Sequence, residues 1–317
     1  MRKTNLLARL DAYLTLREVL GFSPQANRLL LQDFVAYLEE HSDGTPIRAQ
    51  LAVAWACGSS PARGVSGQAA RLRVARAFLT HLKVSLPETE IPPGNLLATP
   101  RRPQPFLFSA EEIRRLLAGA ARFGPKRSLR PHTHQTLFGL LACTGMRSSE
   151  AVNLLVSDVQ LNENPPRLMV RKTKFQKSRW VPLHPSTVEQ LQRYAKLRHE
   201  LNYSGLSDVF FVSEQGQRLD LKILHRTFGR LIYRLDINPR PGQRKPTLHS
   251  FRHTFAVNRL RTWYESGVDP RALLPNLSVY LGHLDPTSTY WYLTAIPELL
   301  NPAAQLFERY AEKGDFK

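Results

Sequence analysis

A proline-rich segment divides the chain into two parts. Residues 86–108, LPETEIPPGNLLATPRRPQPFLF, contain six prolines and show neither helical nor strand periodicity. Proline fixes φ and removes a backbone donor, so such a segment is extended and limited in flexibility. With 317 residues the chain is long enough for two domains. We therefore expect one domain at 1–91, a linker at 92–108 and a second domain at 109–317.

Apolar residues recur at helical spacing in four stretches of the first part, which together predict a four-helix N-terminal domain. These stretches are 5–20, 27–40, 47–57 and 66–84. The last of them also carries Arg71, Arg73 and Arg76. These arginines either form a solvated face or contact DNA phosphates, and the pattern leaves both open. We keep them as candidate DNA-binding residues.

The second part opens with signals for helices. Ser109, with Glu112 three residues later, is typical of a helix N-cap. A helical pattern at 131–155 is interrupted by Gly145. We therefore expect Arg147 at a turn between two helices, projecting from a fixed backbone.

A small β-sheet is expected among the helices of the second part. Residues 167–184, RLMVRKTKFQKSRWVPLH, alternate like two short strands around a lysine-rich turn, which predicts a β-hairpin. Helices are expected at 186–201 and 222–236, with a short strand, DVFFV, between them. The fold class predicted for the whole chain is therefore mainly α with a small β-sheet.

The charge balance indicates a polyanionic partner. The formal net charge is +18, the pI is about 10.3, and residues 109–317 hold 31 of the 44 Lys and Arg residues. Nucleic acid and an anionic membrane surface both suit this charge, and nucleic acid is favoured. No run approaches the ~20 apolar residues of a membrane span, so we expect no membrane partner.

Neither the cysteines nor the N-terminal stretch indicates export. Cys57 and Cys143 are the only cysteines, and they form neither a metal-type nor a CxxC spacing. No disulfide framework is therefore expected. Arg9 and Asp11 interrupt the apolar residues of the N-terminal stretch, which is unlike a signal peptide. We expect the chain in a reducing cytoplasm.

Residues suited to phosphodiester chemistry are concentrated at 247–293. The stretch holds two histidines and an arginine ahead of a tyrosine pair, namely His249, Arg252, His283, Tyr290 and Tyr292. A phosphodiester under attack gains negative charge on its non-bridging oxygens, and planar guanidinium groups match that geometry while staying charged. Arg147 and Arg252 are the candidates for this role.

Cleavage also needs a nucleophile and groups that carry protons. A phenol has a pKa of about 10, so it attacks at neutral pH only where cations or a proton acceptor favour the phenolate. His249 and His283 suit this role, and Lys174 in the hairpin turn suits protonation of the leaving alkoxide. Taken singly, each feature has an ordinary explanation: a surface helix, a solvated turn or a packed aromatic run.

The order of five motifs resembles the tyrosine recombinase/integrase family. They are TGMRSSE, TKFQKSRWVPL, HSFRHTFA, LGH and a tyrosine nine residues after that histidine. They span about residues 109–295, and the helical N-terminal domain is similar to the family's SAM-like core-binding domain. The resemblance implies a C-shaped clamp around duplex DNA, closed by a C-terminal tyrosine-recombinase catalytic domain.

The resemblance also implies roles for individual residues. Matched to the motifs, the catalytic set is Arg147, Lys174, His249, Arg252, His283 and Tyr292, with Glu150 as a supporting carboxylate. The hairpin adds candidate DNA contacts at Lys172, Lys177 and Arg179. A helix over 287–293 would place Tyr290 and Tyr292 about 200° apart, so only one could reach the phosphate. We expect Tyr292 to be the nucleophile and Tyr290 to be a packing residue.

A family member of this kind is expected to be a site-specific DNA recombinase or integrase. It would cut and rejoin duplex DNA through a 3′-phosphotyrosyl intermediate, need no metal or other cofactor, and serve DNA integration or transposition of a mobile genetic element. The implied partners are a recombination site, a homotetramer on DNA and accessory DNA-bending or co-recombinase proteins in the bacterial cytoplasm or nucleoid. A type IB topoisomerase, a DNA-binding regulator without catalysis and a metal-dependent nuclease remain alternatives.

Two C-terminal stretches stay open from the sequence. Residues 261–280 look longer than in compact relatives and are either a contact to a neighbouring subunit or a longer loop. Residues 298–312 carry an apolar stripe on an expected terminal helix. That helix packs either on its own domain or, as the resemblance implies, on an adjacent protomer.

Overall fold

The computed structural model describes two compact units. The described residues are 5–22, 25–42, 46–58, 64–97, 103–125, 127–171, 178–203, 205–282 and 287–295. Unit 1 comprises Met1–Arg102 and unit 2 comprises Pro103–Lys317. The division falls within the segment that the sequence predicts as a linker.

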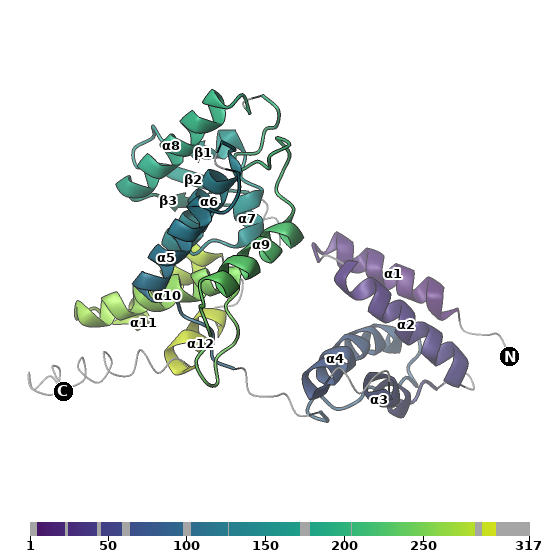
Figure 1. The fold of residues 1–317 in the computed structure, drawn as a ribbon. Coiled ribbons are helices and arrows are strands. Elements are labelled where there is room, and N and C mark those ends of the chain that lie inside the picture. Colours follow the sequence, from purple (N-terminus) through teal and green to yellow (C-terminus); the bar gives the residue numbers. More distant parts are fainter. Residues whose placement is uncertain are drawn as a thin grey trace, which may run out of the picture. The chain divides into compact units, whose positions relative to one another are not determined.

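The described residues of unit 1 form four helices, in agreement with the apolar periodicity (Figure 1). They are α1 (Leu6–Val19), α2 (Gln25–His41), α3 (Ala49–Gly58) and α4 (Gly64–Lys83). Phe34 and Phe78 are among the residues of the shared core. Leu86, Ile91 and Leu97 also pack against it. The first half of the proline-rich segment is therefore part of unit 1.

Arg71 lies inside unit 1, which corrects its assignment as a DNA contact. The residue is only 4% exposed, and its Nη2 donates to Asp33 Oδ2 at 3.1 Å and to the Trp55 carbonyl at 3.3 Å. Its guanidinium also lies over the Trp55 ring, 3.8 Å from the centroid. Because Arg73 is exposed and Arg76 half-buried, these two remain candidates for DNA contact.

Unit 2 is mainly helical with one small antiparallel sheet. Its helices are α5 (Ala110–Ala121), α6 (Arg130–Thr144), α7 (Ser148–Val152), α8 (Pro185–Glu200), α9 (Leu221–Arg234), α10 (Leu248–Glu265), α11 (Pro270–Leu281) and α12 (Thr287–Ala295), with a 3-10 turn at Val156–Asp158. The sheet has the order β1 (Val159–Gln160), β2 (Arg167–Val170), β3 (Arg179–Pro182). Antiparallel pairing of β2 with β3 confirms the predicted hairpin. Within the described ranges, no helix combines the length and apolar character needed to traverse a bilayer.

The core of unit 2 is built around α6. This helix packs against α5, α8 and α10 and buries residues around most of its circumference, as a central helix must. The Phe138 ring lies 5.6 Å from Phe228 of α9 and 6.2 Å from Phe251 of α10. Phe108 stacks 4.9 Å from Phe251. The end of the proline-rich segment therefore belongs to this core, while the sheet contacts α11 through β3.

Local sequence signals set two helix boundaries near the site. Ser109 and Glu112 form the predicted capping box, because each side chain accepts a hydrogen bond from the other residue's backbone N–H. Helix α6 ends at Gly145, which adopts a left-handed φ of 62°. Helix α7 begins three residues later, so Arg147 lies between the two helices as predicted.

Two other segments differ from the expectations. Residues 209–212 of DVFFV are buried but form no regular strand, because Val209 and Val212 each pair through a single bridge and the Val212 N–H donates to the Tyr194 hydroxyl. A side chain thus occupies the place of a neighbouring strand. Residues 261–280 form no long loop: they belong to α10 and α11, joined only by residues 266–269.

The position of Arg71 predicts a stability defect rather than a DNA-binding defect. We expect Arg71→Ala to lower the free energy of unfolding of unit 1 by about 2 kcal/mol, because it removes charge-assisted hydrogen bonds from a buried site. Arg73→Ala, on an exposed position of the same helix, should leave the free energy of unfolding unchanged. Urea denaturation followed by circular dichroism measures both. A stable Arg71→Ala protein with weakened DNA binding would restore the assignment of Arg71 as a DNA contact.

Candidate active site

Arg147 is positioned by a turn that only glycine permits. A Cβ on Gly145 would lie 2.6 Å from Cδ1 of Phe255, and the positive φ disfavours any other residue. The turn places Arg147 as the N-cap of α7, with Glu150 at the third helical position. The Arg147 N–H donates to Glu150 Oε2 at 2.9 Å. The sequence TGMRSSE therefore fixes the backbone of both residues.

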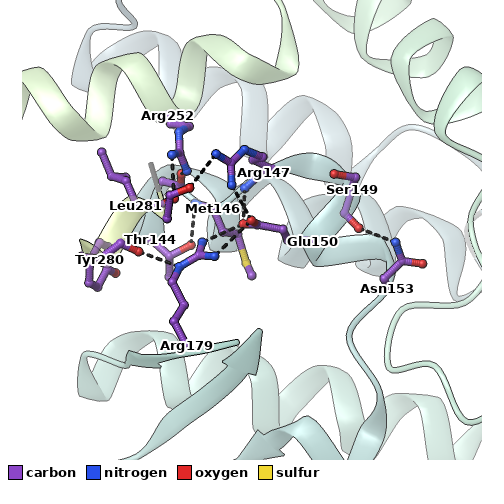
Figure 2. Close-up of polar contacts among 12 residues, drawn as sticks. Thr144, Met146, Arg147, Ser149, Glu150, Asn153, Arg179, Arg252, Tyr280 and Leu281 are labelled. Carbon is purple, nitrogen blue, oxygen red and sulfur yellow. Dashed lines mark hydrogen bonds and ion pairs between the residues drawn. The ribbon is translucent and has the colours of Figure 1, made fainter. Parts of the chain in front are cut away.

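The Glu150 carboxylate is enclosed by two guanidinium groups (Figure 2). Arg147 Nη1 donates to Oε1 at 2.7 Å, while Arg179 donates from Nη1 to Oε1 at 3.1 Å and from Nη2 to Oε2 at 2.7 Å. Burial by itself raises the pKa of Glu150, but the hydrogen bonds and charges of Arg179 and Arg147 outweigh it and hold that pKa below its usual value. Glu150 is therefore ionised at neutral pH.

The end of α11 binds three arginines through three successive carbonyls. Arg179 Nε donates to the Tyr280 carbonyl at 2.7 Å, Arg252 Nη2 to the Leu281 carbonyl at 2.6 Å, and Arg147 Nη2 to the Gly282 carbonyl at 2.9 Å. The last carbonyls of a helix have no partners within it, and the helix dipole makes this end negative. Cations from β3, α10 and the α6–α7 turn therefore meet at this point.

Arg252 is the most deeply buried of these arginines. The residue is buried on α10, and its Nη1 donates to the Gly145 carbonyl at 3.0 Å. Burial and, to a smaller extent, the charge of Arg147 lower the pKa of Arg252 to about 10, whereas Glu150 and Tyr292 oppose the shift. Arg252 therefore remains charged at neutral pH and lies close enough to Tyr292 to interact with it.

Tyr292 is buried beside two histidines of α10. Its ring is packed in a cluster between α10, α11 and α12, with 2% of the residue exposed. The hydroxyl lies 2.8 Å from His253 Nδ1, and the His253 ring lies 4.6 Å from that of His249, centroid to centroid. A phenol is thus held next to groups that are able to accept its proton.

Most of the candidate site residues that the structure describes therefore lie close together. Arg147, Glu150 and Arg252 gather at the end of α11, Tyr292 interacts with Arg252 from α12, and His249 lies next to His253, the partner of Tyr292. Lys172, Lys174, Lys177 and His283 lie outside the described residues, as does the expected helix 298–312. Among the residues that the structure describes, no group of His, Cys, Asp or Glu side chains is arranged to hold a metal ion.

Three side chains have positions that the motifs did not indicate. Tyr290 was expected to pack but is 45% exposed, whereas Tyr292 is the buried member of the pair, because the two project from different faces of α12. Arg179 was expected to contact DNA but is directed into the Glu150 cluster. His253 was overlooked, although its spacing of four residues from His249 places both on one face of a helix.

Comparison with known proteins identifies the family. A model of the phage integrase family matches residues 107–298, more than half of the chain. The chain belongs to this family. The y4rB protein of Sinorhizobium fredii, whose name describes an integrase/recombinase, is 41% identical over 94% of this chain and 95% of its own length. The tyrosine recombinase XerD of Rhizobium meliloti is 30% identical over 76% of this chain and 73% of its own. The chain is thus a tyrosine-type site-specific recombinase.

Solved structures share the fold of the recombinase. The XerH recombinase in a post-cleavage complex with palindromic difH DNA matches with a TM-score of 0.69 and 18% identity, covering 90% of this chain and 80% of that one. A lambda integrase tetramer bound to a Holliday junction matches with a TM-score of 0.62 and 16% identity, covering 90% and 79%. The predicted fold class, a helical core-binding domain followed by a tyrosine-recombinase catalytic domain, is confirmed.

The Gly145 turn gives a test of how the recombinase positions Arg147. We expect Gly145→Ala to destabilise the chain by more than about 1–2 kcal/mol, because of the left-handed backbone and the collision with Phe255, and to slow DNA cleavage about 100-fold by displacing Arg147. Gly139→Ala in α6 is the control, since its Cβ would make only ordinary contact at 3.9 Å. It should stabilise the helix by about 0.5–1 kcal/mol. Equal unfolding free energies for the two variants would contradict this account.

Proposed function

We propose that the recombinase cuts and rejoins duplex DNA by attack of Tyr292 on the scissile phosphate. A bond forms between Tyr292 Oη and phosphorus while the bond from phosphorus to the 5′ oxygen breaks. The products are a 3′-phosphotyrosyl link and a 5′-hydroxyl, and the hydroxyl of a partner strand reverses the step. The observation that carries this proposal is the gathering of Arg147, Arg252 and Tyr292 around one end of α11.

The arginines retain donors for a phosphate. Each of the two Nη atoms of Arg147 makes one bond within the cluster but carries two hydrogens, and 32% of its side chain is exposed. Within the described part of the chain, Arg252 Nε has no hydrogen-bond partner. Three guanidinium groups face the single carboxylate of Glu150, so positive charge is in excess where the attacked phosphate gains negative charge.

Proton transfer completes the proposed reaction. The proton of the phenol passes to a histidine of α10, for which the contact between Tyr292 and His253 supplies a short path. Lys174 protonates the departing 5′ oxygen. His283 is proposed, as from the sequence, to orient the phenol or accept its proton together with His249. The phosphotyrosyl ester retains the energy of the broken bond, so rejoining needs no external energy source.

Helix α9 supports DNA binding by the same unit. Its four basic residues recur every fourth position and no acidic residue accompanies them: Lys222, Arg226, Arg230 and Arg234. All four are exposed, and the opposite face of the helix is apolar and buried. Helix α9 packs against α7, which carries Glu150, so the basic row is on a helix that adjoins the active site. We propose that this row follows the phosphates flanking the cleaved bond.

The proposed assembly is a homotetramer of clamps on two recombination sites. Its support is the likeness in fold to a lambda integrase tetramer bound to a Holliday junction. Accessory DNA-bending or co-recombinase proteins complete the expected partners, and integration or transposition of mobile DNA is the expected process. A tetramer places a second 5′-hydroxyl within reach of each phosphotyrosine, as strand exchange requires.

The nucleophile is tested by trapping the covalent intermediate. A duplex selected from a random library for binding to the protein is nicked next to each candidate cleavage position, so that the short 5′-hydroxyl fragment diffuses away. We expect wild type and Tyr290→Phe to form a protein–DNA adduct in EDTA, and Tyr292→Phe to form none. The adduct is seen as a band shift in a denaturing gel.

Tyr290→Phe serves as the matched control, because it removes the same atom from the neighbouring exposed tyrosine. An adduct that persists in Tyr292→Phe would exclude Tyr292 as the nucleophile. Cleavage that requires added divalent metal and leaves no protein–DNA adduct would favour the nuclease alternative.

The α9 row is tested by the salt dependence of DNA binding. Removal of one phosphate-binding cation should reduce the slope of log Kobs against log salt by about 0.9. We therefore expect Arg226→Gln and Arg230→Gln each to reduce that slope by about one, measured by fluorescence anisotropy. The control is Arg193→Gln on α8, which removes an exposed arginine that is paired with Glu189 and should leave the slope unchanged. An unchanged slope in the α9 variants would rule out the proposed phosphate contacts.

A further inference from the structure

Arg179 has a place in the site that the motifs do not assign. We propose that Arg179 is a positioning residue for the cleavage step proposed above: it holds Arg147 through Glu150 and through the end of α11, and it does not touch DNA. This inference rests on the proposed function, because the arginine it positions is the one that binds the scissile phosphate.

The contacts of Arg179 leave its guanidinium committed to the protein. Its Nε donates to the Tyr280 carbonyl, and its Nη1 and Nη2 donate in parallel to the two oxygens of Glu150 (Figure 2). The side chain is 11% exposed, against 32% for Arg147. All three nitrogens thus have partners inside the cluster. Nη1 and Nη2 each keep a second hydrogen, but with only 11% of the side chain exposed a phosphate would reach them only if Arg179 moved out of the cluster.

Arg179 acts on both ends of the Arg147 guanidinium. It shares the Glu150 carboxylate with Arg147 Nη1. It also packs against the backbone of Gly282, where a Cβ would lie 2.8 Å from Arg179 Nη1, and the carbonyl of Gly282 accepts from Arg147 Nη2. The absence of a side chain at Gly282 allows this approach. A displacement of Arg179 would therefore be transmitted to Arg147 by two independent routes.

The charge of Arg179 also determines how firmly Glu150 holds Arg147. With two cations sharing the carboxylate, Arg147 provides only part of the neutralisation that a buried Glu150 requires. Without Arg179, Arg147 becomes the main cationic partner of that carboxylate and is drawn towards it. Less of its charge is then available to the phosphate in the transition state. Arg179 thus keeps Arg147 available for DNA as well as in place.

Arginine suits this position better than lysine. A guanidinium presents a planar fork that binds both carboxylate oxygens while Nε serves a third acceptor. A lysine ammonium restores the charge but reproduces the fork only in part. Arg179→Lys should therefore fall between wild type and Arg179→Gln.

The first test separates positioning from DNA contact. On the nicked duplex described above, we expect Arg179→Gln to slow adduct formation about 10- to 100-fold. Its DNA affinity and the salt slope of binding should equal those of wild type. Arg167→Gln, on the neighbouring strand β2, is the matched control, because Arg167 pairs with Glu163 outside the cluster. A weaker affinity with a reduced salt slope in Arg179→Gln would show a phosphate contact and overturn the proposal.

The second test separates positioning from a general structural role. Replacing the scissile phosphate by a neutral methylphosphonate removes the charge that Arg147 neutralises. Arg179→Gln should then slow cleavage by no more than about threefold, because Arg147 placement no longer limits the rate. In a Glu150→Gln background, the substitution should likewise add only a small factor, since the shared carboxylate is gone. Equal slowing on both substrates, with full additivity, would overturn the proposal.

Folding and the proposed function are controlled separately. If Arg179→Gln does not fold, as judged by its thermal transition, Arg179→Lys is compared with wild type in the same two tests and decides the outcome. A wild-type protein that binds the duplex yet forms no Tyr292-dependent adduct would refute the proposed function itself. A normal wild-type adduct with unimpaired Arg179 variants would refute only the role of Arg179.

Discussion

The carboxyl end of α11 is the anchor on which the active site depends. Its last carbonyls have no partners within the helix and lie at the negative end of the helix dipole. Arg179, Arg252 and Arg147 each bind one of three successive carbonyls there, although they come from a strand, a helix and a turn that are far apart in the sequence. The position of this one helix end therefore sets the relative positions of all three cations.

Three arginines so close together would repel one another without compensation. The shared carboxylate of Glu150 and the three carbonyls supply that compensation, and they do so incompletely: one negative charge faces three positive ones. A fully neutralised cluster would gain nothing from a phosphate. In the proposed reaction, the remaining positive charge is set in place before DNA arrives, so its full effect is felt when the attacked phosphate gains charge. The uncompensated charge thus lowers the stability of the free protein, and in the proposed reaction it stabilises the transition state.

Local patterns in the sequence predicted much of this arrangement. The Ser109 cap, the Gly145 turn and the β2–β3 hairpin depend on residues within a few positions of one another, and all three were found. Arg71 was misassigned, and the buried contacts of Arg179 were missed, for the opposite reason. Whether an arginine faces solvent or a carboxylate is decided by a partner 38 or 29 residues away, which periodicity does not reveal. Basic residues in a strongly basic chain therefore look like DNA contacts until their burial is known.

Tyr292, the proposed nucleophile, is restrained differently from the arginines. Arg252 is bound by carbonyls on two elements, whereas Tyr292 lies on the short helix α12, and its hydroxyl lies within hydrogen-bond distance of His253. A hydrogen bond of this kind contributes about 0.5–1.5 kcal/mol, and the packing of the buried ring adds to it, so both oppose a move of the phenol towards a phosphate. DNA shifts that balance only by interacting more favourably with one position than with the other. The excess charge beside Arg252 provides this difference, because a phosphate bound there offers the phenol a reaction partner that His253 does not.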